Sequence, residues 1–273
     1  MTTPPRPTKA DRRDDARAAA LKLKEDQQRA ARRQRTLAIG LLVAGLAVVG
    51  VVVAVILSSA SGGSSGSAQV QPSVSSDRGG VVFDADGVVP PTDGAAPVPG
   101  SFGDGVVIVS VYSDFMCPIC GAFESLNGPV LDELRAAGEI VVDYHPVSIL
   151  DRYSQGTAYS TRAAQAVFVV AEEAPDQFVA FSELLFANQP AENTEGLTDA
   201  QIADFATQAG VPEDVVATFE DGTFTWWVAQ ATDAASQDLA QLATPTILLD
   251  GVQTSVDWRT EGALAAAIED ARG

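Results

Sequence analysis

Two cysteines are the residues of this chain whose type and spacing indicate chemistry most directly. Cys117 and Cys120 stand three apart, with Pro118 between them, and the chain has no other cysteine. An apolar run, residues 106–112, leads into the pair, and residues 121–126 resemble a helix in composition. N–H groups at the start of such a helix, together with its dipole, would stabilise a thiolate at Cys117. The pattern predicts a redox-active dithiol that exchanges disulfides with other thiols.

Other roles for the pair are metal binding, a permanent disulfide and inert burial. A zinc site needs four ligands, and Cys117, Cys120 and the single histidine, His145, supply three, so zinc could bind only between chains. A permanent disulfide would close a very short loop and would constrain the unfolded chain little. Inert burial is disfavoured by Pro118, which suits the first turn of a helix where no N–H partner is lost.

An apolar segment near the N-terminus predicts a membrane anchor. Residues 37–57 form an uninterrupted apolar run of 21 residues, enough for a helix to cross a hydrocarbon core of about 30 Å. Residues 1–36 carry 11 of the 17 Lys and Arg against five acids, a net charge of +6. This excess predicts a single-pass protein of the cell membrane, with a cytoplasmic N-terminus and an exported catalytic domain. A cleaved signal peptide is the alternative, although both segments are long for one.

The rest of the chain is strongly acidic. Beyond residue 36 it has six Lys and Arg and 31 Asp and Glu, a net charge of −25. This charge argues against nucleic acid and anionic lipid surfaces as partners, and solubility is a sufficient reason for it. Outside the cytoplasm disulfides form and persist, so the dithiol would work in oxidising surroundings.

Composition divides the chain into four parts. Residues 1–36 are a charged cytoplasmic segment, and residues 37–57 are the predicted transmembrane helix. Residues 58–79 are rich in Ser and Gly and indicate a flexible linker. Residues 80–273 are the predicted folded domain, with a helical insertion over about 155–219.

Strands and helices are interleaved in the predicted domain. Strands are expected at residues 81–83, 106–112, 140–144, 246–249 and 252–254, the last two joined by an Asp250-Gly251 turn. Further helices are expected at about 225–242 and 261–271. The helix that begins at the cysteines should be kinked or interrupted at Gly128-Pro129 and should end at Gly138.

In this order of elements and in two motifs, the chain resembles the DsbA-type thiol-disulfide oxidoreductases, in the membrane-anchored form of Gram-positive bacteria. The motifs are SDFMCPIC at residues 113–120 and ATPTILLDG at residues 243–251. Each motif alone is moderately specific, whereas the two together, with a helical insertion between them, are strongly specific. The resemblance covers roughly residues 80–273 and implies an α/β thioredoxin fold with an inserted helical domain.

The resemblance also implies the site. Cys117 would be the nucleophile and Cys120 the resolving thiol, while Thr244 and Pro245 would form a cis peptide bond that faces them. The backbone of Thr244 would then be presented to an extended substrate. Glu124, seven residues after Cys117, matches an acidic position of the DsbA type and is the remaining candidate catalytic residue. The sequence indicates no cofactor and no metal site.

Two positions depart from the best-known members of the family. Many of its oxidases have histidine where this chain has Ile119, and Ile119 cannot donate a hydrogen bond to the thiolate. Thioredoxin-fold enzymes often have a buried acid where this chain has Val111. These departures leave the redox potential open more than the chemistry.

The sequence therefore predicts a membrane-tethered oxidase that accepts electrons from thiols of unfolded or reduced exported proteins. A reductase or isomerase for particular targets is the first alternative. An isomerase usually needs a dimerisation domain, and none is evident, so we expect a monomer. A redox-inactive binding module is the second alternative, and the presence of Cys117, Cys120 and Thr244-Pro245 argues against it. The reoxidising partner should be a separate membrane protein of the quinone-linked kind that the resemblance implies.

The remaining candidates have simpler explanations. His145, the only histidine, is interpreted as a structural residue, although it lies near the predicted active edge of the sheet. Trp226, Trp227 and Trp258 are interpreted as packing residues, and Asp114 as a loop cap or a solvated acid.

Overall fold

The computed structural model describes residues 69–273. The basic segment, the predicted transmembrane helix at residues 37–57 and linker residues 58–68 lie outside this part of the chain. Within residues 69–273, no helix combines the length and the apolar character that crossing a membrane requires.

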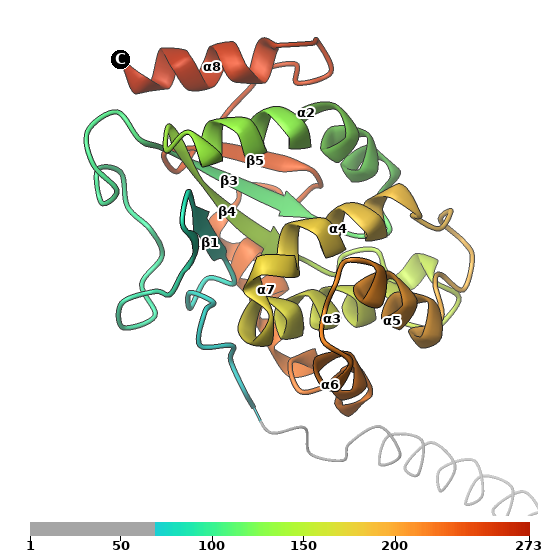
Figure 1. Cartoon of the computed structure of the whole chain (residues 1–273). Coiled ribbons are helices and arrows are strands. Elements are labelled where there is room, and N and C mark those ends of the chain that lie inside the picture. The colour runs from blue at the N-terminus through green and yellow to red at the C-terminus, as the bar shows by residue number, and fades with distance from the viewer. Residues whose placement is uncertain (1–68) are drawn as a thin grey trace, which may run out of the picture. The chain divides into compact units, whose positions relative to one another are not determined.

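A six-stranded mixed sheet runs through the domain in the order β2-β1-β4-β3-β5-β6 (Figure 1). Its central strands β3 and β4 are parallel, and every other neighbouring pair is antiparallel. Nearly every residue of β3 and β4 is buried, which explains why both are continuous apolar runs in the sequence. The strands are β1 (Val81–Asp84), β2 (Gly87–Val89), β3 (Val107–Ser113), β4 (Ile140–Pro146), β5 (Thr246–Leu249) and β6 (Val252–Gln253).

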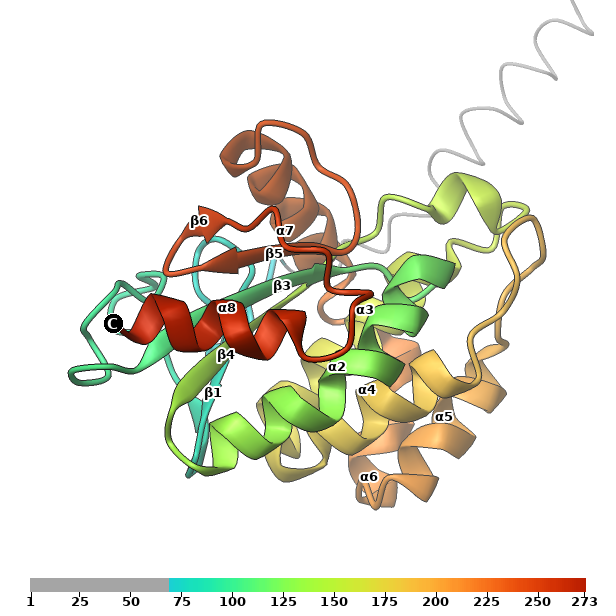
Figure 2. The same cartoon turned by 90° about the horizontal axis from the view of Figure 1, so that it is seen from above.

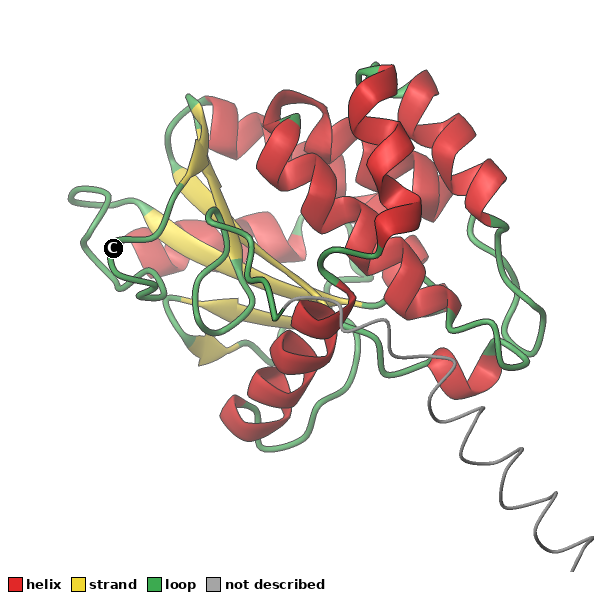
Figure 3. Ribbon diagram, turned by 90° about the horizontal axis from the view of Figure 1, so that it is seen from below, coloured by secondary structure: helices red, strands yellow, loops and turns green. Residues whose placement is uncertain are grey.

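Seven α-helices accompany the sheet in the described part of the chain. Four of them, α3 to α6, form the predicted insertion and gather at one end of the sheet (Figure 3). Short 3-10 turns lie at Asp151–Tyr153, Pro175–Gln177 and Ala217–Asp221. The helices are α2 (Pro118–Ala136), α3 (Tyr159–Glu173), α4 (Phe178–Ala187), α5 (Asp199–Gln208), α6 (Glu213–Val216), α7 (Thr225–Asp238) and α8 (Ala263–Arg272).

Helices cover both faces of the sheet. Val109 and Val111 of β3 point to one face, where α2 and α8 pack through Phe123 and Leu264 (Figures 1 and 2). Tyr112 points to the other face, where it packs against α7. This alternation follows from the period of two in a strand, and it leaves the end of β3 buried between two layers.

The core of the insertion is continuous with the surroundings of the cysteines. Phe115, two residues before Cys117, stacks on Phe186 of α4 with ring centroids 4.6 Å apart. Phe178 at the start of α4 stacks on Phe83 of β1, also at 4.6 Å. The insertion is therefore packed against both the sheet and the segment that carries the dithiol.

The folded domain begins earlier than residue 80, where the sequence placed its start. Val74 is buried in the core, and Ser75 forms a β-bridge with Val81. Arg78 forms an ion pair with Asp238 of α7. A Ser- and Gly-rich composition indicated a linker here, but tertiary contacts hold residues 74–79 against the domain.

The helix that follows the cysteines is not interrupted at Pro129. Helix α2 continues through this residue to Ala136, so the predicted interruption is wrong, while a kink at the proline stays a prediction. Its other predicted feature is present, because Gly138 ends the helix in the left-handed region with φ +72°. Packing of Phe123 and Leu131 in the core holds the helix together on both sides of the proline.

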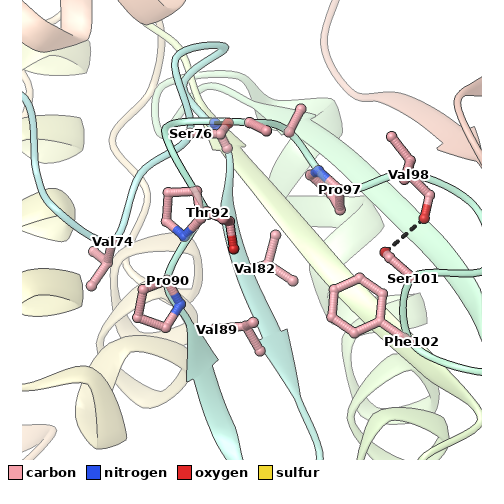
Figure 4. Close-up of a pocket in the computed structure, with 14 residues that line it drawn as sticks. Val74, Ser76, Val82, Val89, Pro90, Thr92, Pro97, Val98, Ser101 and Phe102 are labelled. Carbon is pink, nitrogen blue, oxygen red and sulfur yellow. Dashed lines mark hydrogen bonds between the residues drawn. The ribbon is translucent and has the colours of Figure 1, made fainter.

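A cavity of about 310 Å³ lies beneath the Pro- and Gly-rich loop between β2 and β3 (Figure 4). Val74 and Val82 form part of its floor, and Pro97 and Phe102 belong to the loop that encloses it. None of the predicted site residues lines this cavity, so it is separate from the dithiol.

Candidate active site

The two cysteines stand where β3 leads into α2. Cys117 is the N-cap of the helix, with φ −77° and ψ 112°, and Pro118 is the first helical residue. The carbonyl of Cys117 accepts hydrogen bonds from the N–H groups of Cys120 at 2.9 Å and Gly121 at 3.3 Å. The sequence prediction of a dithiol at a helix N-terminus is confirmed.

The second predicted motif lies beside the first. Thr244 and Pro245 directly precede β5, and Thr246 of that strand pairs with Tyr112 of β3. The Thr244–Pro245 peptide bond is cis, as the resemblance implied. The carbonyl oxygen of Thr244 accepts a hydrogen bond from Sγ of Cys117 at 3.3 Å. Pairing of β3 with β5 therefore joins two motifs that are far apart in the sequence.

The surroundings of Cys117 favour its thiolate. A hydrogen bond with the Cys120 thiol has the largest effect on the pKa of Cys117, and N–H groups of Cys120 and Ile119 act in the same direction. Burial opposes them, but the pKa of Cys117 is still lowered to about 6. Cys117 is therefore largely ionised at neutral pH, as a nucleophilic or leaving thiol requires.

Cys120 has the opposite character. It is 1% exposed, against 6% for Cys117, and burial raises the pKa of its thiol well above the ordinary value. The neighbouring Cys117 raises it further. Cys117 is itself nearly buried, and the carbonyl of Thr244 in the cis-proline loop lies against its sulfur. The order of the two exposures nevertheless matches an attacking Cys117 and a resolving Cys120.

Asp114 is fully buried, and its carboxylate accepts three hydrogen bonds, so it is not a solvated acid. Its Oδ1 accepts hydrogen bonds from the N–H of Met116 at 2.8 Å and the hydroxyl of Ser160 at 2.7 Å, and its Oδ2 accepts one from the N–H of Leu150 at 2.9 Å. Burial raises the pKa of this carboxyl to about 6, although the three donors oppose the rise. The interpretation as a loop cap is confirmed, and the carboxyl also ties the loop to α3.

Gln189 is a residue of the site that the sequence did not reveal. It follows α4, and its side-chain amide nitrogen donates to the carbonyls of Phe115 and Cys117, each at 2.9 Å. A polar residue in a loop more than 70 positions away carries no local signal for this contact. The packing of Phe186 on Phe115 brings the end of α4 to the redox loop.

Glu124 stands on α2 four residues after Cys120. Partial burial raises the pKa of its carboxyl to about 7, with smaller contributions from Glu183 and Asp132. It lines a surface groove between α2 and α4 together with Glu183. Among the described residues, no hydrogen bond joins Glu124 to either thiol, so its catalytic role stays a prediction.

His145 and the tryptophans are packing residues. His145 is buried, its Nε2 lies 2.7 Å from Oδ2 of Asp143, and its ring stacks on Tyr112. Trp227 is also buried and donates through Nε1 to the hydroxyl of Ser75. Trp226 is half-buried, and Trp258 is buried against Phe123.

The arrangement can carry out two-electron exchange between thiols and disulfides. One thiol is acidic and slightly exposed, the second is more deeply buried and hydrogen-bonded to the first, and the cis-proline loop contacts the first. These features place the chain in the class of thioredoxin-fold dithiol proteins. The family model described as Thioredoxin matches residues 103–270, and the chain belongs to this family.

Solved structures of similar fold come from the same class. Reduced DsbG, a disulfide bond oxidoreductase of Mycobacterium tuberculosis, is 35% identical and matches over 61% of this chain and 78% of its own, with a TM-score of 0.53. Reduced DsbA of the same organism is 30% identical over 71% and 93% of the two chains, with a TM-score of 0.57. The resemblance to DsbA-type proteins and the inserted helical domain are therefore confirmed.

Curated relatives match over shorter stretches. Disulfide bond formation protein D of Bacillus subtilis is 28% identical over 150 residues, which are 54% of this chain and 64% of that protein. The serine/threonine-protein kinase PknE of Mycobacterium tuberculosis is 30% identical over 136 residues, 48% of this chain. The chain spans only about a quarter of the length of that kinase (24%), so the likeness concerns one part of it.

Proposed function

We propose that this chain is an extracytoplasmic thiol-disulfide oxidoreductase that introduces disulfides into exported proteins through Cys117 and Cys120. The observation that carries the proposal is the lowered pKa of Cys117, about 6, beside a cis-proline loop. Stabilisation of the thiolate favours the reduced dithiol, and a favoured reduced form makes the disulfide a stronger oxidant. Names of the related solved structures, which include a DsbA and a disulfide bond oxidoreductase, support the same activity.

The reaction proceeds in two exchange steps. A substrate thiolate attacks Sγ of Cys117, the Cys117–Cys120 bond breaks, and Cys120 leaves with the electron pair and takes up a proton. A second substrate thiolate then attacks the substrate sulfur of the mixed disulfide, and Cys117 leaves as a thiolate. The substrate loses two electrons and gains a disulfide, while the enzyme becomes a dithiol. The low pKa of Cys117 makes it a good leaving group in the second step.

Unfolded segments are the substrates that the surface near the dithiol suits. Ile119 in the first turn of α2 is 45% exposed, and Leu126 near the middle of the same helix is 41% exposed. The backbone of Thr244 beside Cys117 can pair with an extended chain. Apolar contacts and main-chain pairing recognise unfolded chains with little dependence on sequence.

The proposed setting is the outer face of the cell membrane. The basic segment 1–36 before the apolar run at residues 37–57 supports a cytoplasmic N-terminus and an anchored, exported domain. Reoxidation after each turnover needs an electron acceptor, for which we propose a quinone-linked membrane protein. An anchor would keep that partner and this domain at a high local concentration.

A reductase or isomerase that serves particular targets is the competing function. The equilibrium of the isolated domain with glutathione separates the two possibilities. An oxidase should have a potential well above that of thioredoxin, about −270 mV, and closer to that of DsbA, about −120 mV. The oxidised domain should also form a disulfide in a reduced, unfolded protein in a stoichiometric reaction. A potential near −270 mV would reject the oxidase.

A further inference from the structure

The side-chain amide of Gln189 is hydrogen-bonded to the main chain of the redox loop, the segment 114–117 before α2. Its Nε2 donates one hydrogen bond to the carbonyl of Phe115 and one to the carbonyl of Cys117, both at 2.9 Å. The two hydrogens of the NH₂ group can account for both bonds. A residue of the helical insertion thus holds the main chain on both sides of Met116.

Gly121 leaves the space that this amide occupies. A Cβ atom at position 121 would lie 2.8 Å from Oε1 and 3.4 Å from Cδ of Gln189. Gly121 lies in the first turn of α2, where glycine is a poorer helix former than alanine. The close approach of Gln189 supplies a physical reason for glycine here.

The peptide that Gln189 holds also determines the surroundings of the reactive sulfur. The carbonyl of Cys117 accepts from the N–H groups of Cys120 and Gly121 as well as from Gln189. The N–H groups of Ile119 and Cys120 in the same turn help to stabilise the thiolate. A rotation of the Cys117 peptide would therefore move Sγ relative to these donors.

We propose that Gln189 is a positioning residue of the redox site, which fixes the Cys117 peptide through its two hydrogen bonds and thereby maintains the acidity of the thiol. Gly121 makes this contact possible, because it has no Cβ atom that would displace the amide of Gln189. The inference rests on the dithiol exchange proposed above, but it holds for exchange in either direction.

The first test replaces the amide. In Gln189→Leu the carbonyls of Phe115 and Cys117 lose their donor, and in Gln189→Glu a carboxylate faces them. We expect the pKa of Cys117, followed by thiolate absorbance, to rise by about half a unit or more in both variants. The equilibrium constant with glutathione should shift about threefold or more toward a less oxidising disulfide. Asn188→Leu is the matched control, because the Asn188 amide donates only to Leu184 of its own helix.

The second test uses Gly121. Gly121→Ala in the wild-type background should displace the amide and raise the pKa of Cys117 as Gln189→Leu does. In a Gln189→Ala background the space is empty, so Gly121→Ala should leave the pKa unchanged and should raise the melting temperature. This dependence on background distinguishes a specific contact from a general loss of packing.

The outcomes separate the inference from the proposed function. A Gln189→Leu protein that melts at a lower temperature but keeps the wild-type pKa and glutathione equilibrium would overturn the inference. If Gln189→Leu fails to fold, the Gly121→Ala protein with an unchanged pKa would overturn it in the same way. A shifted pKa in variants of a domain whose wild-type potential is that of a reductase would support the inference and reject the oxidase.

Discussion

The thiol of Cys117 donates a hydrogen bond to the main-chain carbonyl of Thr244, which is 3.3 Å away and 127 residues further along the chain. The carbonyl accepts this bond only while the thiol keeps its proton, so ionisation of Cys117 leaves the carbonyl free. The disulfide form, with which the proposed oxidation starts, also has no thiol proton, and in that form the Thr244 carbonyl is open to the main-chain pairing with substrate that we propose.

The roles of the two cysteines can be distinguished by trapping. Because Cys117 is the more exposed and the more acidic thiol, Cys120→Ser should accumulate mixed disulfides with exported proteins. Cys117→Ser should accumulate none, since the thiol of Cys120 is buried and protonated. Non-reducing electrophoresis after acid trapping measures both. The reverse pattern would overturn the assignment of nucleophile and resolving thiol.

The stability of the reduced domain should depend on pH through Cys117. The pKa of this thiol is about 6 in the folded protein, against about 9 when it is unperturbed. A lowered pKa stabilises the fold fully above about pH 9, and the contribution is lost as the pH falls through about 6. At pH 7 it amounts to about 1.4 kcal/mol, one unit above the folded pKa.

Calorimetry of the two redox forms measures this contribution. The oxidised domain has no thiol at Cys117 and serves as the control. The melting temperature of the reduced form minus that of the oxidised form should decrease from about pH 8 to about pH 5. A difference that does not change with pH would show that the folded environment leaves the thiol unperturbed.

Asp114 should change the stability of the fold with pH in the direction opposite to Cys117. Its pKa is raised to about 6 from about 3.8, so its contribution favours folding below about pH 4 and is lost as the pH rises through about 6. Asp114→Asn removes the titration. The free energy of unfolding of the wild type minus that of the variant should therefore be about 2 to 3 kcal/mol larger at pH 4 than at pH 7.

Asp270→Asn is the matched control for this experiment, because Asp270 is exposed on α8. The free energy of unfolding of this variant relative to the wild type gives the baseline against which the change at Asp114 is measured. Urea unfolding at the two pH values gives both comparisons. If the difference in free energy of unfolding between the wild type and Asp114→Asn does not change with pH, the carboxyl of Asp114 keeps an ordinary pKa in the wild type. The three hydrogen-bond donors would then offset its burial.

Ile119→His should make the disulfide more oxidising. Ile119 is exposed between the cysteines, and its N–H already helps to stabilise the Cys117 thiolate. A histidine there adds a donor or a positive charge, so the pKa of Cys117 should fall and the potential should rise by about 15 to 30 mV. Leu126→His, at a similarly exposed position of α2, is the control and should leave the potential unchanged. Equal potentials for Ile119→His and the wild type would contradict this account.

The topology of the full chain can be tested by proteolysis. The charge difference between residues 1–36 and the rest predicts that residues 58–273 lie outside the membrane and remain attached to it. Protease added to intact spheroplasts should remove the C-terminal domain, and a cytoplasmic marker should survive. Full protection of the domain would reject the orientation, and its recovery in the medium without protease would favour a cleaved signal.

The sequence by itself determined the dithiol and the order of the longer strands and helices, because each has a local signal: a proline in the first turn of a helix, or an apolar run of strand or helix period. Strand β2 was not predicted, and the cis bond at Thr244–Pro245 was implied only by the family resemblance. Pairing of strands β3 and β5 then joined the two motifs, as the resemblance implied. The assignment of Cys117 as the more acidic thiol also followed locally, from its position at a helix N-terminus.

Only the tertiary structure decided which other groups reach the site. Gln189 and Asp114 are ordinary polar residues in the sequence, but packing of the insertion places one over the Cys117 peptide and the other under the redox loop. Tertiary packing also brings residues 74–79 into the domain. Such contacts join residues far apart in the chain, and they depend on shape and burial, which no short segment of sequence encodes.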